Sequence, residues 1–238
     1  MKRVVVIPAR YGSTRLPGKP LAEIAGKPLI QWVYERASTS TLKDEVLIAT
    51  DDVRIRDAAI SFGASVVMTR SDCASGTDRV YDAIKGRDAG IIVNLQGDEP
   101  LIRGDMIDHL FSALERESLG MATFCSPLVD KSELESPHVV KVVLDRNGFA
   151  LYFSRSPIPF VQKNANAVAY KHIGIYGFSR AFLETFVSLS RGRLEETESL
   201  EQLRALEAGY KIKVLIVDYD GISVDTREDL ERAKSLLP

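Results

Sequence analysis

Residues 4–20 read Val-Val-Val-Ile-Pro-Ala-Arg-Tyr-Gly-Ser-Thr-Arg-Leu-Pro-Gly-Lys-Pro, a β-branched run followed directly by a loop rich in glycine, proline and cations. The run predicts a buried strand over residues 4–8. In open α/β sheets, ligands bind beyond the carboxyl ends of the strands. The stretch therefore predicts the first strand of an α/β sheet and the position of a binding site.

The rest of the chain alternates apolar runs with helical patterns, which is typical of an α/β fold with a mostly parallel sheet. Further strands are expected at residues 46–50, 66–68, 91–95, 121–126, 139–144, 149–153, 171–178 and 211–217. Helices are expected at residues 28–37, 54–62, 79–85, 106–115, 180–188, 195–208 and from 227 onward. We expect one domain over residues 1–238. Residues 129–165, which contain the turn signal Asp145-Arg-Asn-Gly148, are expected to leave the sheet as a hairpin used for dimerisation.

The composition excludes several classes of protein. Hydrophobic residues make up 45% and charged residues 27%, which is ordinary for a soluble globular protein. No apolar run approaches the roughly 18 residues of a membrane helix, and no membrane partner is expected. The two cysteines, Cys73 and Cys125, are isolated and predict neither a disulfide framework nor a zinc site, so a cytoplasmic location is expected.

The charge distribution favours a small anionic ligand. The net charge of −2 argues against a nucleic-acid partner. Residues 1–34 nevertheless carry six cations against a single glutamate, a local charge of +5. Such a local excess suits a small polyanion better than a long one.

Three cations gather in the loop after the first strand. Arg10, Arg15 and Lys19 alternate there with Gly12 and Gly18. Arginine forks match phosphate oxygens in pairs, and glycine lets backbone N–H groups approach a ligand. Phosphate binding is therefore favoured over a merely solvated loop.

Two familiar nucleotide motifs are excluded. Five residues, instead of the four of a P-loop, separate the two glycines, and a proline follows the lysine. No GxGxxG motif follows the first strand, so a dinucleotide-binding fold is unsupported.

Three aspartates at ends of predicted elements compete for a metal. Asp98, in Gln96-Gly-Asp-Glu-Pro100, is the best candidate for a Mg²⁺ ligand, with a turn-forming role as the alternative. Asp225 is evenly balanced between metal ligand and helix cap, because Asp225-Thr-Arg-Glu228 fits a capping box. Asp51 equally suits a cap of the helix that follows it.

Other polar positions give weaker signals. The loop Ser75-Gly-Thr-Asp-Arg79 could read the edge of a base, but a helix N-terminus uses the same residue types. Arg155 and His172 adjoin predicted strands, and a lone histidine is more often structural than catalytic. No Ser/His/Asp or Cys/His grouping indicates covalent catalysis.

Taken together, these stretches resemble the 3-deoxy-manno-octulosonate (Kdo) cytidylyltransferase family. The matching motifs cover nearly the whole chain in order: IPARYGSTRLPGKPL, LIATDD, SGTDR, VNLQGDEP, VKVVLDRNGFALYFSRSPIP, KHIGIYGF, LEQLR and VDTREDLERA. Asp78 stands where glutamate is frequent, and Arg227 where proline is frequent. Neither departure removes a group that the chemistry needs.

The resemblance implies a nucleotide-diphospho-sugar transferase-like α/β/α sandwich around a mixed, mostly parallel sheet, acting as a homodimer. The implied nucleotide-binding residues are Pro8, Ala9, Arg10, Gly12, Ser13, Arg15, Lys19, Asp51, Ser75, Gly76, Arg79 and Asp98. The implied sugar-binding residues are Gln96, Arg155, His172, Tyr176, Glu201 and Gln202, with Arg155 and His172 as a cationic pair near the sugar carboxylate. Asp98 and Asp225 are implied as Mg²⁺ ligands, and the implied catalytic set is Arg10, Arg15, Lys19, Asp98 and Asp225.

The implied reaction is transfer of CMP from CTP to the anomeric hydroxyl of Kdo, with release of pyrophosphate, for lipopolysaccharide biosynthesis. The motifs do not separate Kdo from its 8-amino analogue or another acidic sugar. A non-catalytic nucleotide-binding regulator would need a broken metal site or lost phosphate cations, and the sequence shows neither. A purely structural dimer would leave the charges at the strand ends unexplained.

Overall fold

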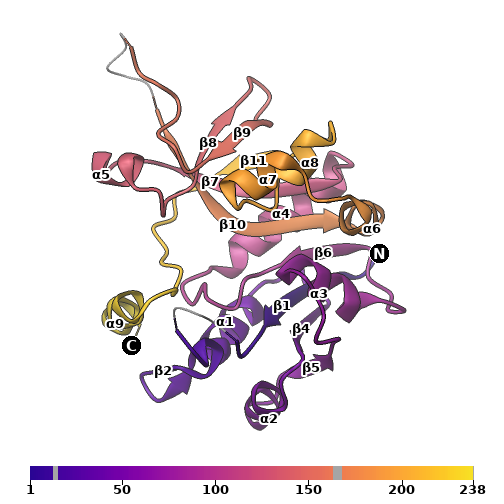
Figure 1. The fold of residues 1–238 in the computed structure, drawn as a ribbon. Helices are drawn as coiled ribbons and strands as arrows, with labels where there is room; N and C mark the ends of the chain where they lie inside the picture. The colour runs from indigo at the N-terminus through magenta and orange to yellow at the C-terminus, as the bar shows by residue number, and fades with distance from the viewer. Residues whose placement is uncertain (13–15, 163–167, 238) are drawn as a thin grey trace.

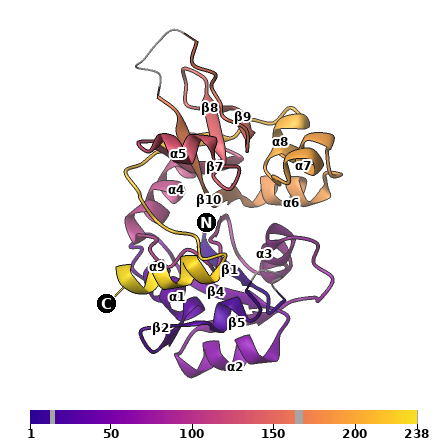
Figure 2. The same cartoon turned by 60° about the vertical axis from the view of Figure 1, so that its left-hand side comes forward.

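A mixed β-sheet lies between two layers of helices in the computed structural model, which describes residues 1–12, 16–162 and 168–237 (Figures 1 and 2). The main strands are β1 (Arg3–Ala9), β4 (Glu45–Thr50), β5 (Ser65–Met68), β6 (Ile91–Asn94), β7 (Met121–Pro127), β8 (Lys141–Leu144), β9 (Ala150–Ser154), β10 (Tyr170–Ser179) and β11 (Lys213–Ile216). Two short strands, β2 (Glu23–Ile24) and β3 (Lys27–Pro28), pair separately.

The order of the strands in the sheet is β11-β7-β10-β6-β1-β4-β5. Strands β6, β1, β4 and β5 run parallel, whereas β10 is antiparallel to both of its neighbours, β6 and β7. In β1, Val5 and Ile7 face one layer of helices, and Val4 and Val6 face the other. Burial on both faces explains the continuous β-branched run. The expected α/β sandwich with a mixed sheet is confirmed.

Helices cover both faces of this sheet. One face packs against α1 (Leu29–Ser38), α2 (Val53–Ser61) and α4 (Gly104–Arg116). The other packs against α3 (Gly76–Ile84), α6 (Arg180–Ser188) and α8 (Leu203–Glu207). Pro28 was expected inside the first turn of a helix, but it is the N-cap of α1. No helix in the described part of the chain is long and apolar enough to cross a membrane.

The single helix expected over residues 195–208 is wrong. The chain forms α7 (Arg193–Glu198) and α8, and between them Ser199 adopts a left-handed conformation with φ of 52°. Glu195 and Arg204 are buried and form a bidentate ion pair of 2.7 and 2.8 Å. This pair holds the two short helices against each other and leaves residues 199–202 as a turn.

Two helix caps lie one residue later than expected. Asp52, not Asp51, caps α2, and Thr226, not Asp225, forms the capping box of α9 (Arg227–Leu236) with Asp229. Because the neighbours supply the caps, the carboxylates of Asp51 and Asp225 can face the carboxyl ends of the strands.

The excursion at residues 129–165 contains α5 (Lys131–Glu135), β8 and β9. Strand β8 pairs with both β10 and β9, so the hairpin remains attached to the sheet while it projects from one end of the molecule (Figure 1). Large apolar side chains are exposed on or beside it: Val129, Leu151, Phe160, Val161 and Val168. Its use in dimerisation remains a prediction.

The segment after β11 crosses back to the first half of the sheet (yellow trace, Figure 1). The backbone N–H of Val224 donates to the carbonyl of Asp98 at 2.9 Å. Beyond this point, Leu230 and Ala233 of α9 pack against Leu29 and Trp32 of α1. The crossing therefore brings Asp225 next to the loop that follows β6.

Candidate active site

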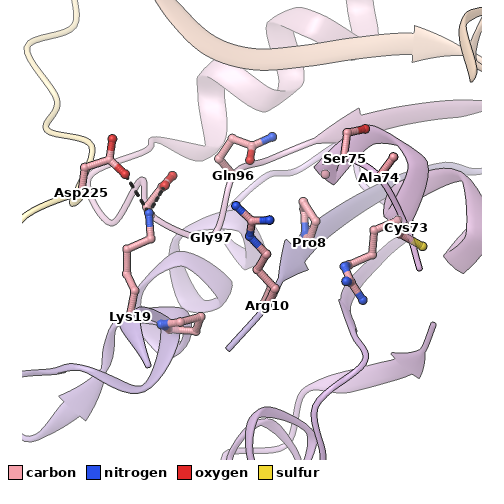
Figure 3. A pocket seen from close by; sticks show the side chains of 14 residues that line it. Pro8, Arg10, Lys19, Cys73, Ala74, Ser75, Gln96, Gly97 and Asp225 are labelled. Atoms are coloured by element: carbon pink, nitrogen blue, oxygen red, sulfur yellow. Dashed lines mark hydrogen bonds and ion pairs between the residues drawn. The ribbon is translucent and has the colours of Figure 1, made fainter. Parts of the chain in front are cut away.

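A cavity of about 330 Å³ lies at the carboxyl ends of β1 and β6 (Figure 3). Ten of the residues expected from the sequence line it: Pro8, Ala9, Arg10, Lys19, Ser75, Gly76, Arg79, Gln96, Asp98 and Asp225. Ser13 and Arg15 lie outside the described residues. Segments far apart in the chain thus converge where the parallel strands end, as expected for a sheet of this kind.

Lys19 joins the two candidate metal ligands. Its Nζ donates to Asp98 Oδ2 at 2.6 Å and to Asp225 Oδ1 at 3.0 Å (dashed lines, Figure 3). Burial opposes the charged ammonium, but the two carboxylates outweigh it and raise the pKa of Lys19 above its ordinary value. Lys19 is therefore charged and neutralises much of the charge of the acid pair.

The acid pair fits a Mg²⁺ ion that is also bound by substrate phosphates. Magnesium needs only one or two protein carboxylates when phosphate oxygens and waters complete its ligands. Within the described residues, no group of three or more His, Cys, Asp or Glu could hold a metal. The two oxygen donors already surround a cation, the Lys19 ammonium, which shows that the carboxylates converge on one positively charged centre.

Glu99 is a buried carboxyl that the sequence reasoning missed. Burial, together with the nearby charge of Asp98, raises its pKa to about 8, and Tyr219 donates its hydroxyl to Glu99 Oε2 at 3.3 Å. Glu99 is therefore neutral at pH 7, beneath the charged acid pair. The adjacent acids in Asp98-Glu99 were the signal that could have indicated it.

A smaller hollow of about 280 Å³ adjoins the first cavity. Arg10, Gly12, Asp51 and Arg79 are among its lining residues. The buried Arg79 guanidinium lies 3.1 Å from Asp51 Oδ1, so Asp51 fixes an arginine instead of capping a helix.

Ser75 caps a helix and also lines the main cavity. Its hydroxyl caps α3 by accepting from the backbone N–H of Asp78 at 3.1 Å. Ser75 and Gly76 also line the main cavity, so the helix N-terminus itself forms part of the wall.

A second cavity, of about 340 Å³, meets the first at the acid pair. Gln96, Asp98 and Asp225 line both cavities, and His172 lines only the second. Lys171 also lines the second cavity, with Nζ 3.0 Å from Asp220 and 3.3 Å from Glu133. The sequence reasoning missed Lys171, although it precedes His172 in the same motif.

Arg155 and His172 were expected to be a cationic pair, and the expected charge of His172 is wrong. Burial lowers the pKa of His172 to about 3, so its ring is neutral. Its Nε2 lies 3.0 Å from the Thr123 hydroxyl, and its ring packs edge-on against Phe153. Arg155 donates to the backbone carbonyls of Glu198 and Pro137. These contacts fix both side chains without forming a shared positive centre, and of the two only His172 lines the second cavity.

Buried polar groups connect the turn between α7 and α8 to the sheet. The Thr77 hydroxyl donates to Glu201 Oε2 at 2.6 Å and accepts from Asn94 Nδ2 at 3.1 Å. Gln96 Nε2 donates to Asn94 Oδ1 at 3.1 Å. Thr77 was expected only as part of the loop over residues 75–79 that could read a base, and Asn94 was not expected, because their link to Glu201 joins residues distant in the sequence.

Two atoms of this turn lack a hydrogen-bond partner among the described residues, namely Glu201 Oε1 and Gln202 Nε2. Both atoms are buried, although the Glu201 side chain as a whole is 27% exposed, and burial raises the pKa of Glu201. Buried polar groups normally have partners, so these two can serve a polar ligand. Tyr176 is buried nearby, with its ring 5.5 Å from that of His172.

Comparisons with known proteins identify relatives of the chain. Residues 4–212 match the family described as Cytidylyltransferase. The chain is 50% identical over 251 residues to the 3-deoxy-manno-octulosonate cytidylyltransferase of Thermodesulfovibrio yellowstonii, covering 100% of this chain and 98% of that protein. It is also 50% identical over 242 residues to the 8-amino-3,8-dideoxy-manno-octulosonate cytidylyltransferase of Shewanella baltica strain OS195, covering 100% and 99%.

A solved structure of CMP:2-keto-3-deoxy-manno-octonic acid synthetase in complex with CTP has the same fold. It superposes with a TM-score of 0.95 at 45% identity, covering 99% of this chain and 98% of that one.

Proposed function

The chain belongs to the cytidylyltransferase family, and from that premise we propose that it transfers CMP from CTP to the anomeric hydroxyl of Kdo. The resemblance indicated by the motifs is thereby confirmed at the level of the family. The observation that carries the proposal is the meeting of two cavities at Asp98 and Asp225, since the reaction requires two substrates to share one charged centre.

The first cavity suits CTP. Arg10 and Lys19 offer positive charge to its phosphates, and we assign Arg15 of the same loop to them as well. Ser75 and Gly76 offer polar groups to the cytosine or ribose from the N-terminus of α3. Fixed cations at a reacting phosphate stabilise the charge that develops on the leaving pyrophosphate.

Asp98 and Asp225 would hold Mg²⁺, which supplies charge neutralisation at the phosphates and raises the acidity of the sugar hydroxyl. Lys19 lies between these carboxylates and keeps the acid pair from repelling the anionic substrates. It remains charged, so it can turn to a phosphate oxygen once other positive charge reaches the carboxylates.

The second cavity and the turn beside it suit the sugar. Gln96 lines both cavities, and Glu201 Oε1 and Gln202 Nε2, which have no hydrogen-bond partner among the described residues, can bond sugar hydroxyls. We assign Arg155, His172 and Tyr176 to the same wall. In this arrangement the neutral His172 ring offers hydrogen bonding and shape instead of charge.

The reaction exchanges one phosphorus–oxygen bond for another. The anomeric oxygen of the sugar forms a bond to the α-phosphorus, and the bond from that phosphorus to pyrophosphate breaks. The proton of the hydroxyl passes to solvent water, and the electron pair of the broken bond leaves with pyrophosphate. We propose that the product activates Kdo for lipopolysaccharide synthesis in the cytoplasm, and that the enzyme is a homodimer.

The second candidate is the same chemistry on 8-amino-Kdo. Relatives with either activity in their names have similar identity to this chain, 50% for the Kdo relative and 50–52% for the 8-amino-Kdo relatives. The carboxylates of Glu133 and Asp220 near the second cavity could attract an ammonium group, but both already pair with Lys171. This pairing favours the neutral 8-hydroxyl of Kdo.

Pyrophosphate release tests the proposal. With Mg²⁺, we expect release only when CTP and Kdo are both present, little with UTP, and at least a 100-fold loss in Asp98→Asn. Asp57→Asn, which changes an exposed aspartate of α2, is the matched control and should retain activity. Release with 8-amino-Kdo alone would change the substrate but keep the chemistry. No release with any acidic sugar would refute the transfer reaction and favour the regulator.

A further inference from the structure

We propose that Thr77 is a positioning residue that couples the nucleotide site to the sugar site, so that each substrate strengthens the binding of the other. The inference rests on the proposed function, because it assigns the first cavity to CTP and Glu201 to the sugar. It adds a structural connection through which binding at one site changes the affinity of the other.

Thr77 forms two hydrogen bonds through a single hydroxyl. This hydroxyl donates to Glu201 Oε2 at 2.6 Å and accepts from Asn94 Nδ2 at 3.1 Å. Thr77 is 1% exposed and Asn94 is 0% exposed, so water does not compete for the bond between them, whereas the Glu201 side chain is 27% exposed. Hydrogen bonds to a carboxylate in such surroundings are short and strong.

On the nucleotide side, Thr77 lies directly behind residues that line the first cavity. It follows Ser75 and Gly76, which line that cavity, and it lies in the first turn of α3. Ser75 caps this turn through the N–H of Asp78, so the lining residues and Thr77 share one rigid helix start. A nucleotide that packs against Ser75 therefore restrains the Thr77 hydroxyl.

On the sugar side, Glu201 lies in the turn between α7 and α8. The Thr77 bond fixes one of its oxygens, while the other has no hydrogen-bond partner among the described residues and lies 3.8 Å from Arg204. Holding Oε2 sets the direction of Oε1, the oxygen available to a sugar hydroxyl. Ordering this carboxylate before the sugar arrives lowers the entropic cost of binding it.

The coupling factor is the fold-change in affinity for one ligand that binding of the other ligand causes. Coupling between two sites is reciprocal, so this factor can be measured with either ligand. We would use calorimetry with the α,β-methylene analogue of CTP, which cannot transfer CMP, together with Kdo and Mg²⁺. In the unmodified protein, we expect the analogue to tighten Kdo binding at least fivefold, within the roughly 5- to 150-fold range of known couplings. Kdo should tighten binding of the analogue by the same factor.

Thr77→Val keeps the shape of the side chain but removes the hydroxyl, and Thr77→Ser is the matched control that retains it. We expect the coupling factor to fall to within twofold of unity in the valine variant and to persist in the serine variant. A merely structural role would weaken the binding of both ligands but leave the coupling factor unchanged. If the valine variant is folded, as judged by its thermal melt, and its coupling factor equals that of the unmodified protein, the inference is overturned.

A measurement on the unmodified protein covers the case in which the valine variant fails to fold. Addition of the analogue alone should slow hydrogen exchange of the backbone amides at residues 200–203, and no change there would also overturn the coupling. The proposed function fails separately: if the unmodified protein neither binds Kdo with the analogue present nor releases pyrophosphate from CTP, the assignment of the two sites is itself wrong.

Discussion

At the scale of single residues, the centre of the site is a lysine ammonium held between two carboxylates. We expect Lys19→Met to lower pyrophosphate release at least 100-fold, because the acid pair loses its counter-charge and the phosphates lose a cation. Steady-state rates at saturating CTP and Kdo measure this loss. Lys27→Met removes a surface lysine that pairs with Glu35 and should stay within threefold of the unmodified rate. A Lys19 variant with more than a tenth of the activity would contradict the assigned role.

Glu99 should give the stability of the protein a distinctive pH dependence. Its pKa is raised from 4.5 to about 8 by burial, so the folded state keeps a proton that the unfolded state has lost between these values. The free energy of unfolding therefore falls as pH rises through this window, by about 1.4 kcal/mol per pH unit from this group. The stabilisation linked to the Glu99 proton is fully present below pH 4.5 and is lost above pH 8.

The neutral variant Glu99→Gln isolates that contribution. We would measure the free energy of unfolding by urea at pH 5, 6, 7 and 8 in the presence of a chelator. At each higher pH, the free energy of unfolding of the variant should increase relative to that of the unmodified protein. Parallel pH profiles for the two proteins would mean that the Glu99 carboxyl does not hold its proton in the folded state.

The sequence predicted the site residues that share a local signal. Arg10, Lys19 and Asp98 follow strands whose ends meet in space, so their positions along the chain predict that they lie in one site. The Glu201–Thr77 bond joins residues 124 positions apart, and no local pattern reports it. The neutral state of His172 was missed for a related reason, since it arises from surrounding residues that only the fold brings together.

At the scale of elements, the break between α7 and α8 depends on the buried pair of Glu195 and Arg204. We expect Arg204→Met to lower the free energy of unfolding by about 3–5 kcal/mol, because it leaves a buried carboxylate without its partner. The double variant Glu195→Met/Arg204→Met should recover most of this loss, since it leaves neither charge buried alone. Urea unfolding of both variants tests the pair, and a double variant as unstable as the single one would contradict the argument.

Strands and long helices were predicted well, because burial on one face leaves a period in the sequence and burial on both faces leaves a continuous apolar run. Residues 195–208 defeated the same reasoning. Their composition suits one continuous helix, but the ion pair between Glu195 and Arg204 and the left-handed Ser199 impose a turn. The caps of α2 and α9 were misplaced by one residue, since two neighbouring polar residues offered equally good caps in each case.

At the scale of the whole molecule, the excursion at residues 129–165 exposes apolar side chains that a second copy of the chain could cover. Leu151 is 62% exposed and Phe160 is 87% exposed. We expect the protein to sediment as a dimer and Leu151→Glu/Phe160→Glu to sediment as a monomer, because the paired charges would be buried at the interface. Ile216→Glu, on the edge strand β11, is the matched control and should remain dimeric. A monomeric unmodified protein, or a dimeric double variant, would exclude this surface.

The return of the chain after β11 has a consequence for biosynthesis. Asp98 is made early and Asp225 only after all the strands, and the bond from Val224 to the carbonyl of Asp98 brings the late segment into place. If synthesis ends before this segment, the released polypeptide contains the described strands of the sheet but lacks Asp225. Such a fragment could retain Arg10 and Ser75 in the nucleotide wall and sequester CTP without consuming it. In the intact chain, the same order of events delays chemistry until translation has passed the last strand.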